Sequence, residues 1–362
     1  MAARDFAGNS AALDTFFSDL ERASLDIPGS AGRPVVRPKE QLVRPFIWKD
    51  AEVQRLLKMS EHVKLGERRM LRFMNPGTPD WKYVTPTLSV SIQQILPGEL
   101  AVPHRHTANA IRFFLKGRSY TTVEEDKCVM ERGDLIVTPG WEWHDYGNEG
   151  TEPGVWIDAL DLPLIQYLDS CGYLKSIEEE IGYEVSRKKK LPVRRAGISE
   201  DRYSAVGLRP MTRTAGTSQR NGLIHYRWAN THAALKRLAQ HESDPFDDVM
   251  MEYVDPATGG SVYPTFACCI QMIKPGVKTK AHRQASCAVY YVLEGKGRSV
   301  VDGEAYAWSA GDFFVVPFFH WHEHANTGKA PAILFSLQDF PLMKNLQIYR
   351  EEAHPDGHQK IK

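Results

Sequence analysis

The chain of 362 residues has few cysteines, no net charge and no long apolar run. Its 5 cysteines are an odd number without a Cys-x-x-Cys pair, which favours reduced thiols over a disulfide framework. Basic and acidic residues both number 45, so no global field attracts nucleic acid or an anionic membrane. No stretch approaches the length of a membrane span, and the opening MAARDFAGNSAALDTFF does not resemble a signal peptide. We expect a soluble, cytoplasmic protein.

What the chain does contain is an internal repeat. The segment VTPTLSVSIQQILPGELAVPHRH (84–106) aligns without gaps to VYPTFACCIQMIKPGVKTKAHRQ (262–284), a shift of 178 residues. In the same register, RGDLIVTPGWEWH (132–144) aligns to AGDFFVVPFFHWH (310–322). The shift places the histidines of the first copy on related positions of the second copy: His104, His106 and His144 correspond to His282, Gln284 and His322.

Both copies contain short strand-like runs separated by turn signals, such as the Pro-Gly pairs at 97–98 and 275–276. This pattern predicts antiparallel jelly-roll barrels, whereas helical periodicity lies outside the repeats, at 10–25, 49–63, 162–183, 231–241 and 341–352. We therefore predict an all-β core of two tandem jelly-roll β-barrels with helical N-terminal, linker and C-terminal segments. The expected bounds are 1–65 for the N-terminal arm, 66–163 for the first barrel, 164–245 for the linker, 246–340 for the second barrel and 341–362 for a C-terminal helix and frayed tail.

Two histidines in alternate strand positions, His104 and His106, point to the same face of a sheet. Alone, such a pair favours ordinary hydrogen-bonded histidines over metal ligands. The complete patterns G-x5-H-x-H and G-D-x4-P-G-x3-H resemble those of the cupin superfamily, which implies that His144 joins the pair inside the first barrel. Three neutral imidazoles suit a divalent transition metal and leave coordination positions free.

Many cupins add a glutamate shortly after the His-x-His pair, but Ala110 or Ile111 occupies that place here. A metal held by three neutral ligands keeps its double charge, which favours an anionic, chelating substrate. In the second copy Gln284 replaces the middle histidine, and glutamine is a weak ligand for such metals. We expect a structural second barrel without a tightly held ion, and a weaker site formed by two histidines and Gln284 stays open. His320 is expected on the strand face of His322, and His324 in the turn beyond.

Five further sequence motifs make the resemblance more specific than the cupin superfamily. In order along the chain these are TPTL, PHRHTANAIRF, LIVTPGWEWHDYGN, WIDALDLP and GLRP. Together they resemble the gentisate/salicylate 1,2-dioxygenase family, bicupin enzymes that include 1-hydroxy-2-naphthoate and 5-substituted-salicylate dioxygenases. The resemblance implies an Fe(II) cofactor, O2 as co-substrate, and cleavage of a 2-hydroxybenzoate-type ring, such as that of gentisate or 5-nitrosalicylate, between the carboxyl- and hydroxyl-bearing carbons. It also implies a homotetramer, with a dimer as the alternative.

The same resemblance assigns roles near the metal. Arg112 lies six residues beyond His106, on the same strand face by period-two counting, and matches the arginine that binds the substrate carboxylate. The alternative is an arginine at the barrel rim, salt-bridged to Asp158. Arg68 matches a second substrate-contacting arginine, and Asp158 matches an active-site carboxylate, for which a purely structural salt bridge is an equal alternative.

Four positions depart from the family pattern. Relatives that use gentisate commonly have Gln at Ala108, some have Trp at Ser89 and Gly at Ser91, and a pocket histidine is replaced by Tyr146. We interpret these changes as a reshaped substrate pocket, with Tyr146 able to form a hydrogen bond with a substituent para to the ring hydroxyl. Neutral packing changes are the alternative.

A non-catalytic bicupin that binds an aromatic acid is the competing function. A cupin isomerase or decarboxylase ranks last, because those enzymes usually keep the missing glutamate.

Overall fold

The computed structural model describes residues 43–62, 69–168, 190–193, 196–204 and 222–362, together with Thr15, Ser18, Asp19, Arg22, Leu208 and the backbone of 183–185. Residues 1–42 form one structural unit and residues 43–362 another, and the second unit contains both repeats. Arg68 and most of the predicted helices at 10–25 and 162–183 lie outside the described residues. None of the described helices combines the length and the apolarity that crossing a membrane requires.

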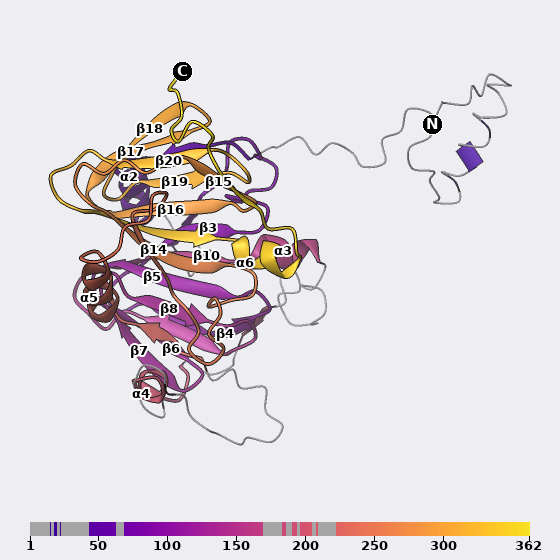
Figure 1. The fold of residues 1–362 in the computed structure, drawn as a ribbon. Coiled ribbons are helices and arrows are strands. Elements are labelled where there is room, and N and C mark those ends of the chain that lie inside the picture. The colour runs from indigo at the N-terminus through magenta and orange to yellow at the C-terminus, as the bar shows by residue number, and fades with distance from the viewer. Residues whose placement is uncertain are drawn as a thin grey trace. The chain divides into compact units, whose positions relative to one another are not determined.

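The first repeat forms two antiparallel sheets, and their strands β2 to β10 are coloured indigo to magenta in Figure 1. The six-stranded sheet has the order β12-β8-β5-β10-β3-β2, and the five-stranded sheet has the order β11-β4-β9-β6-β7. The strands are β2 Arg69–Arg72, β3 Ser89–Ile95, β4 Leu100–His106, β5 Ala110–Lys116, β6 Ser119–Val123, β7 Asp126–Met130, β8 Leu135–Thr138, β9 His144–Gly147, β10 Gly154–Leu160, β11 Tyr183–Val185 and β12 His225–Tyr226.

The second repeat forms a matching pair of sheets, and their strands from β13 onward are coloured orange to yellow in Figure 1. Their orders are β1-β19-β16-β21-β14-β13 and β18-β17-β20-β15-β22. The strands are β1 Phe46–Trp48, β13 Val249–Glu252, β14 Ala267–Ile273, β15 His282–Gln284, β16 Ala288–Glu294, β17 Lys296–Val301, β18 Glu304–Ser309, β19 Phe313–Val316, β20 His322–Asn326, β21 Ala332–Gln338 and β22 Glu351–Ala353. The predicted all-β core of two tandem units is confirmed.

Each repeat gives its first strand to the other barrel. Strand β1 precedes the first barrel in the chain but pairs with β19 of the second, with Phe46 opposite Val315. Strand β12 leads into the second barrel but pairs with β8 of the first, with His225 opposite Ile136. A helix follows each of these strands, α2 (Asp50–Ser60) after β1 and α5 (Trp228–Leu238) after β12. This reciprocal exchange ties the barrels together and was not predicted from the sequence.

Three short helices complete the described fold: α3 (Leu162–Tyr167), α4 (Ile198–Arg202) and α6 (Phe340–Asn345). The helix predicted at 341–352 ends early, because β22 pairs with β15 and extends the second barrel. The frayed C-terminal tail was a wrong prediction. The side-chain amide of Gln359 donates to the carbonyl of Val300 at 2.8 Å, and the backbone N–H of Lys362 donates to the carbonyl of Gly303 at 2.9 Å.

The alternation of side chains on β5 separates two cores. Ile111 and Phe113 belong to the large apolar cluster that includes residues of both barrels, and Phe113 stacks on Phe335 with ring centroids 4.0 Å apart. Phe114 points to the opposite face, into a smaller cluster inside the first barrel. Arg112 is on this inward face too, since it is two residues from Phe114. The strand is therefore buried on both faces, and only one of them surrounds the candidate site.

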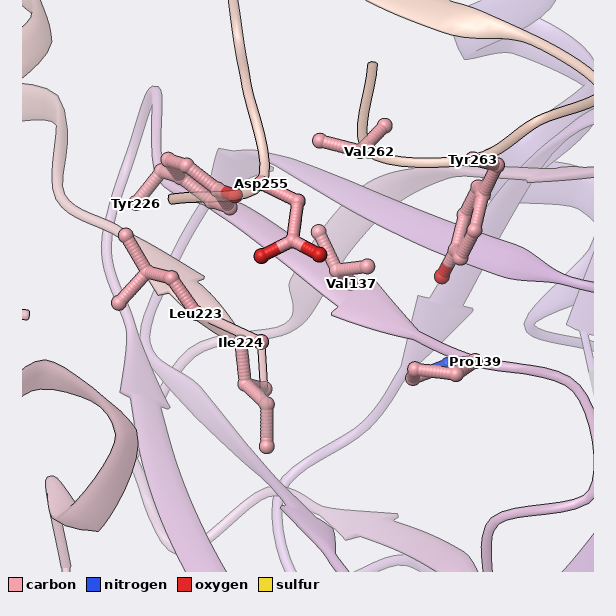
Figure 2. A pocket seen from close by; sticks show the side chains of 9 residues that line it. Val137, Pro139, Leu223, Ile224, Tyr226, Asp255, Val262 and Tyr263 are labelled. Atoms are coloured by element: carbon pink, nitrogen blue, oxygen red, sulfur yellow. The ribbon is translucent and has the colours of Figure 1, made fainter. Parts of the chain in front are cut away.

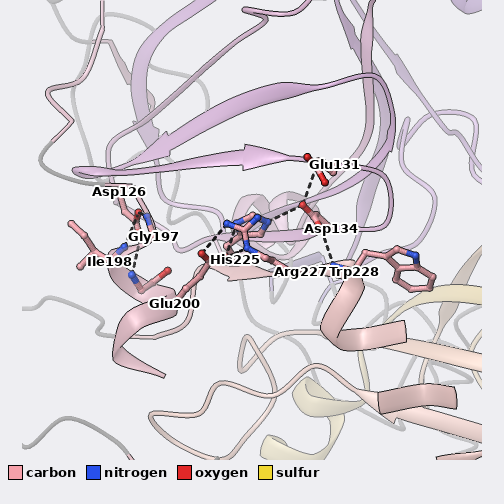
Figure 3. Close-up of polar contacts among 10 residues, drawn as sticks. Asp126, Glu131, Asp134, Gly197, Ile198, Glu200, His225, Arg227 and Trp228 are labelled. Atoms are coloured by element: carbon pink, nitrogen blue, oxygen red, sulfur yellow. Dashed lines mark hydrogen bonds and ion pairs between the residues drawn. The ribbon is translucent and has the colours of Figure 1, made fainter. Parts of the chain in front are cut away.

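A buried imidazole joins the interbarrel segment to the first barrel (Figure 3). The Nε2 atom of His225 lies 2.9 Å from a carboxylate oxygen of Asp134, and its Nδ1 atom lies 3.1 Å from a carboxylate oxygen of Glu200. Burial lowers the pKa of His225, but hydrogen bonds to Asp134, Cys128 and Glu200 outweigh that penalty and raise the pKa to about 11. Asp134 also accepts the backbone N–H of Trp228, the first residue of α5.

This cluster predicts a pH dependence of stability. Because the pKa of His225 is raised above its ordinary value of 6.5, its stabilising effect is complete below that value and is lost as the pH rises towards about 11. The difference in thermal midpoint between the wild-type protein and His225→Gln should therefore shrink between about pH 6 and about pH 9. Calorimetry of both proteins at the two pH values measures it. A difference that stays constant would show that His225 is not charged in the folded protein.

Candidate metal centre and acid-binding site

Three histidines meet on the inner face of the five-stranded sheet of the first barrel. His104 and His106 are alternate residues of β4, and His104 lies directly opposite His144 at the start of β9. Their ligand nitrogens all lie within 4.8 Å of one another, and the three side chains are buried. Within the part of the chain that the structure describes, this is the one group of three or more such side chains with metal-ligand spacing.

The backbone sets the proton position on each ring. The Nδ1 atom of each histidine lies 2.8 to 3.0 Å from a carbonyl oxygen two residues away. A carbonyl oxygen only accepts, so Nδ1 carries the hydrogen and Nε2 keeps its lone pair. The pairs are His104 with Val102, His106 with Ala108, and His144 with Glu142. A neutral imidazole with its hydrogen on Nδ1 is the form that binds a metal through Nε2.

His144 shows most clearly that the residues fit a metal ion. Its Nε2 atom is buried and has no hydrogen-bond partner among the described residues. Burial lowers the pKa of His144 well below its ordinary value, and the neighbouring His104, His106 and Arg112 lower it further. A buried nitrogen that stays neutral and unbonded is costly in a folded protein unless a ligand fills its coordination direction. The donor set suits a divalent transition metal.

Arg112 lies on the inward face of β5, opposite Asp158 of β10, and is only 3% exposed. Its Nη1 atom donates to the hydroxyls of Thr121 and Thr138, both at 3.2 Å. Its Nε atom is buried without a hydrogen-bond acceptor among the described residues, and its closest carboxylate oxygen, from Asp158, is 3.9 Å away. Arg112 is therefore not at the barrel rim, and its ion pair with Asp158 is too long to satisfy the guanidinium edge.

Tyr146 lies in the interior of the first barrel, where four side chains surround it. Its hydroxyl accepts a hydrogen bond from the side-chain amide of Gln93, and its ring meets that of Trp156 edge-on at 5.3 Å. The guanidinium carbon of Arg112 lies 4.9 Å from the centre of the tyrosine ring, and the ring of His104 lies 6.3 Å away. Tyr146 thus lies beside both His104 and Arg112. Sequence reasoning missed Gln93, although period two from Ser91 places it on the same face of β3.

The remaining predicted pocket positions are also buried. Ser89 and Ser91 share one face of β3, and Ser91 lies opposite Asp158. Ala108 precedes β5 and packs in a small apolar cluster with Leu162, while its carbonyl accepts the hydrogen bond from His106. The structure thus brings Arg112, Asp158 and Ser91 together across adjacent strands.

The second barrel keeps part of this arrangement. His282 and His322 are buried with ring centroids 4.3 Å apart, but the amide of Gln284 donates to the side chain of Gln338 at 2.9 Å. The predicted position of His324 in a turn was wrong: β20 continues through it, and its ring is fully buried beside Ser299. His320 was also misplaced, because it precedes β20 instead of lying on it.

A cavity of about 40 Å³ lies on the opposite face of β8 (Figure 2). Val137 and Pro139 of the first barrel line it, together with Gly222, Leu223, Ile224, Tyr226, Asp255, Val262 and Tyr263. The carboxylate of Asp255 points into it, but one oxygen already accepts the backbone N–H of Ala257 at 2.9 Å. None of the predicted site residues lines this cavity, so it is separate from the metal centre.

The fold and the histidine group define a protein of the cupin class. A cupin-domain family model matches residues 91–160 and 269–337, one match in each barrel. The chain is 34% identical over 361 residues to a 5-aminosalicylate 1,2-dioxygenase of a Comamonas species, a match that covers 96% of this chain and 93% of that one. It is 31% identical over 346 residues to a gentisate 1,2-dioxygenase of Aquipseudomonas alcaligenes, covering 94% and 96%.

Among solved structures, a salicylate 1,2-dioxygenase from Pseudaminobacter salicylatoxidans superposes with a TM-score of 0.83 at 30% identity, covering 96% of this chain and 99% of that one. The chain belongs to the gentisate/salicylate 1,2-dioxygenase family of bicupins. The predicted family and the predicted bicupin fold are both confirmed.

Proposed function

We propose that this protein is an Fe(II)-dependent 1,2-dioxygenase that opens the ring of a 2-hydroxybenzoate-type acid between the carboxyl- and hydroxyl-bearing carbons with O2. The observation that carries the proposal is a three-histidine group in the same barrel interior as Arg112, whose Nε atom has no hydrogen-bond acceptor among the described residues. A storage or sensing barrel would need the acid-binding arginine, but it would not need three inward, neutral imidazoles.

The proposed metal ligands are His104, His106 and His144. When bound, iron supplies redox chemistry between the acid and O2 that zinc, which the same ligands tolerate, cannot supply. The protein's own contribution is to hold three Nε2 lone pairs in place through hydrogen bonds from Nδ1 to the backbone. Because all three rings are neutral, the double charge of the metal is left for an anionic substrate to balance.

Arg112 is the proposed carboxylate-binding residue. Thr121 and Thr138 hold its Nη1 atom, which leaves the Nε side of the guanidinium for the two oxygens of a carboxylate. Asp158, 3.9 Å from Nε, is proposed to orient this edge and to balance its charge. Arg68 is kept as a proposed second contact on the family resemblance alone, since it lies outside the described residues.

The named relatives suggest the substrate class. 5-Aminosalicylate, gentisate and salicylate all contain 2-hydroxybenzoate, and they differ in the group on carbon 5, which is amino, hydroxyl or hydrogen. We propose gentisate or a 5-substituted salicylate such as 5-nitrosalicylate for this chain. The proposed contacts that select among these acids are Ser89, Ser91, Ala108 and Tyr146. The alternative substrate is 1-hydroxy-2-naphthoate.

From the resemblance we also propose a cytoplasmic homotetramer, with a dimer as the alternative. Analytical sedimentation would distinguish the two oligomeric states.

The test is anaerobic reconstitution with Fe(II), followed by an oxygen-electrode panel. The panel contains gentisate, salicylate, 5-nitrosalicylate, 5-aminosalicylate and 1-hydroxy-2-naphthoate. We expect oxygen uptake with at least one acid and a new near-ultraviolet absorbance from the opened 2-oxo dienoate. Tight binding of an acid by the iron-loaded protein without oxygen uptake would instead support a non-catalytic binding protein.

Tyr146→Phe should separate the acids by their carbon-5 group. Removal of one hydrogen bond worth about 1 kcal/mol is expected to raise KM roughly fivefold for acids with a hydroxyl or nitro group on carbon 5. Salicylate itself, which has no group there, should be affected less than twofold, roughly. Gln93→Leu is the control, since it removes the partner of the phenol and leaves the phenol in place. Equal effects of Tyr146→Phe on all the acids would show that the phenol does not form a hydrogen bond with the group on carbon 5.

A further inference from the structure

Two equivalent hydrogen bonds cross between the barrels. The hydroxyl of Thr265, in the second repeat, donates to Asp161 at the end of β10 in the first barrel, with an oxygen–oxygen distance of 2.7 Å. The hydroxyl of Thr87, in the first repeat, donates to Asp339 at the end of β21 in the second barrel at 2.6 Å. The two pairs occupy matching positions of the internal repeat. Each barrel therefore fixes one buried aspartate of the other.

In the first barrel this contact continues to the metal centre. Asp161 accepts the backbone N–H of Asn109 at 2.8 Å and its side-chain amide at 2.7 Å. The carbonyl oxygen of the Asn109 side chain then accepts the backbone N–H of Gly140 at 3.0 Å. The next residue, Trp141, donates its backbone N–H to the carbonyl of His106 at 2.7 Å. Three hydrogen-bonded steps and the peptide bond between Gly140 and Trp141 thus connect Asp161 to the backbone of a candidate metal ligand.

The close packing of the loop depends on Gly140. A β-carbon at this position would lie 2.4 Å from the carbonyl oxygen of Thr107, which is far inside van der Waals contact. Any side chain here would push the loop that leads to His144 away from the strand end that carries His106. Tyr263 of the second repeat adds a further fixed point, since its hydroxyl donates to the carbonyl of Ala110 at 2.7 Å.

The second barrel has the equivalent threonine–aspartate hydrogen bond but lacks the asparagine bridge to the loop. Cys287 occupies the position of Asn109, and its backbone N–H donates to Asp339 at 2.7 Å. A thiol, however, has no carboxamide with which to bridge an aspartate and a loop N–H, and Phe318 stands at the position of Gly140. The last hydrogen bond is kept, since the backbone N–H of Phe319 donates to the carbonyl of Gln284 at 2.9 Å. Among the described residues, the asparagine bridge is what distinguishes the barrel with three histidines.

We propose that Thr265, a residue of the second barrel, is a positioning residue for the metal centre of the first barrel. It fixes Asp161, which fixes Asn109, which holds the 139–141 loop against the strand end of His106. The second barrel is then part of the active-site architecture and more than a structural duplicate. The inference rests on the proposed metal centre, but it does not depend on which acid is oxidised.

The experiment compares Thr265→Val with Thr87→Val, which removes the equivalent hydroxyl that donates to Asp339. Co(II) alone is the probe, titrated into each full-length metal-free protein and followed by its visible absorption under chelator competition. Loss of an outer hydrogen-bond partner typically weakens metal binding 10- to 100-fold, so Thr265→Val should raise the Co(II) dissociation constant by about 10-fold. Thr87→Val should change it less than about twofold, although both variants should lower the thermal midpoint of the metal-free protein similarly.

Thr265→Ser retains the hydroxyl and is expected to restore Co(II) affinity. If Thr265→Val does not fold, Thr265→Ala is measured in the same way, because it also removes the hydroxyl but leaves no bulky methyl pair against Asp161. Unchanged Co(II) affinity in the Thr265 variants, or equal weakening by Thr87→Val, would overturn the proposal. Since the readout is metal binding, a protein that oxidises none of the acids would refute the proposed function without deciding the role of Thr265.

Discussion

Replacing His104 with alanine is expected to abolish tight metal binding and oxygen uptake together. The variant removes one of three imidazoles whose ligand nitrogens lie within 4.8 Å of one another. Removal of an outer hydrogen-bond partner alone costs roughly 10- to 100-fold in metal affinity, so loss of a ligand should exceed about 100-fold. Two remaining neutral nitrogens would leave an Fe(II) ion mostly dependent on water for coordination.

The measurement is the iron content after anaerobic reconstitution and desalting, together with oxygen uptake in the presence of the best acid of the panel. His282→Ala is the matched control, because His282 occupies the equivalent strand position in the second barrel and is also buried. It should keep one iron per chain and most of the turnover. Turnover by an iron-free His104→Ala protein would contradict the proposed metal chemistry. Loss of iron in His282→Ala would instead indicate a functional ion in the second barrel.

The repeat made most of the fold predictable from the sequence. Turn signals and Gly-Asp motifs recur at the same spacing in both copies, and short alternating strands between such turns have few packing solutions other than a sandwich or barrel. The exchange of β1 and β12 could not be predicted in this way. β1 is only three residues long, and its partner β19 lies near the other end of the chain, so no local pattern records the pairing.

The candidate site was predictable to a similar extent. Period-two counting correctly placed His104 and His106 on one strand face. It placed Arg112 on that same strand, whereas Arg112 lies on β5 of the six-stranded sheet, with its side chain facing the same barrel interior. It failed for His324, because nothing in HWHEHAN marks where the strand ends. The position of the Nδ1 hydrogens and the role of Asn109 as a bridge depend on backbone carbonyl and amide directions, which residue types do not reveal.

Replacing Arg112 with methionine is expected to remove most of the affinity for the acid while leaving the metal in place. Arg112 is not a metal ligand, and methionine fills a similar volume without charge. Truncating one partner of a buried charge pair costs about 2–5 kcal/mol, so a loss of roughly 100-fold in affinity, about 3 kcal/mol, is expected. Isothermal titration of salicylate into the iron-loaded protein without oxygen gives this affinity directly.

A neutral ligand shows whether the loss comes from the carboxylate. Salicylamide has the same ring and hydroxyl but no negative charge, so it should bind the wild-type protein much more weakly than salicylate. In Arg112→Met the preference for salicylate over salicylamide should fall by about the same 100-fold, and the preference that remains reports the charge of the metal. Arg112→Lys should lie between, because an ammonium keeps the charge but cannot offer two parallel N–H groups. If Arg112→Met still prefers salicylate as strongly as the wild-type protein, another cation holds the carboxylate, and Arg112 serves only to pair with Asp158 and the two threonines.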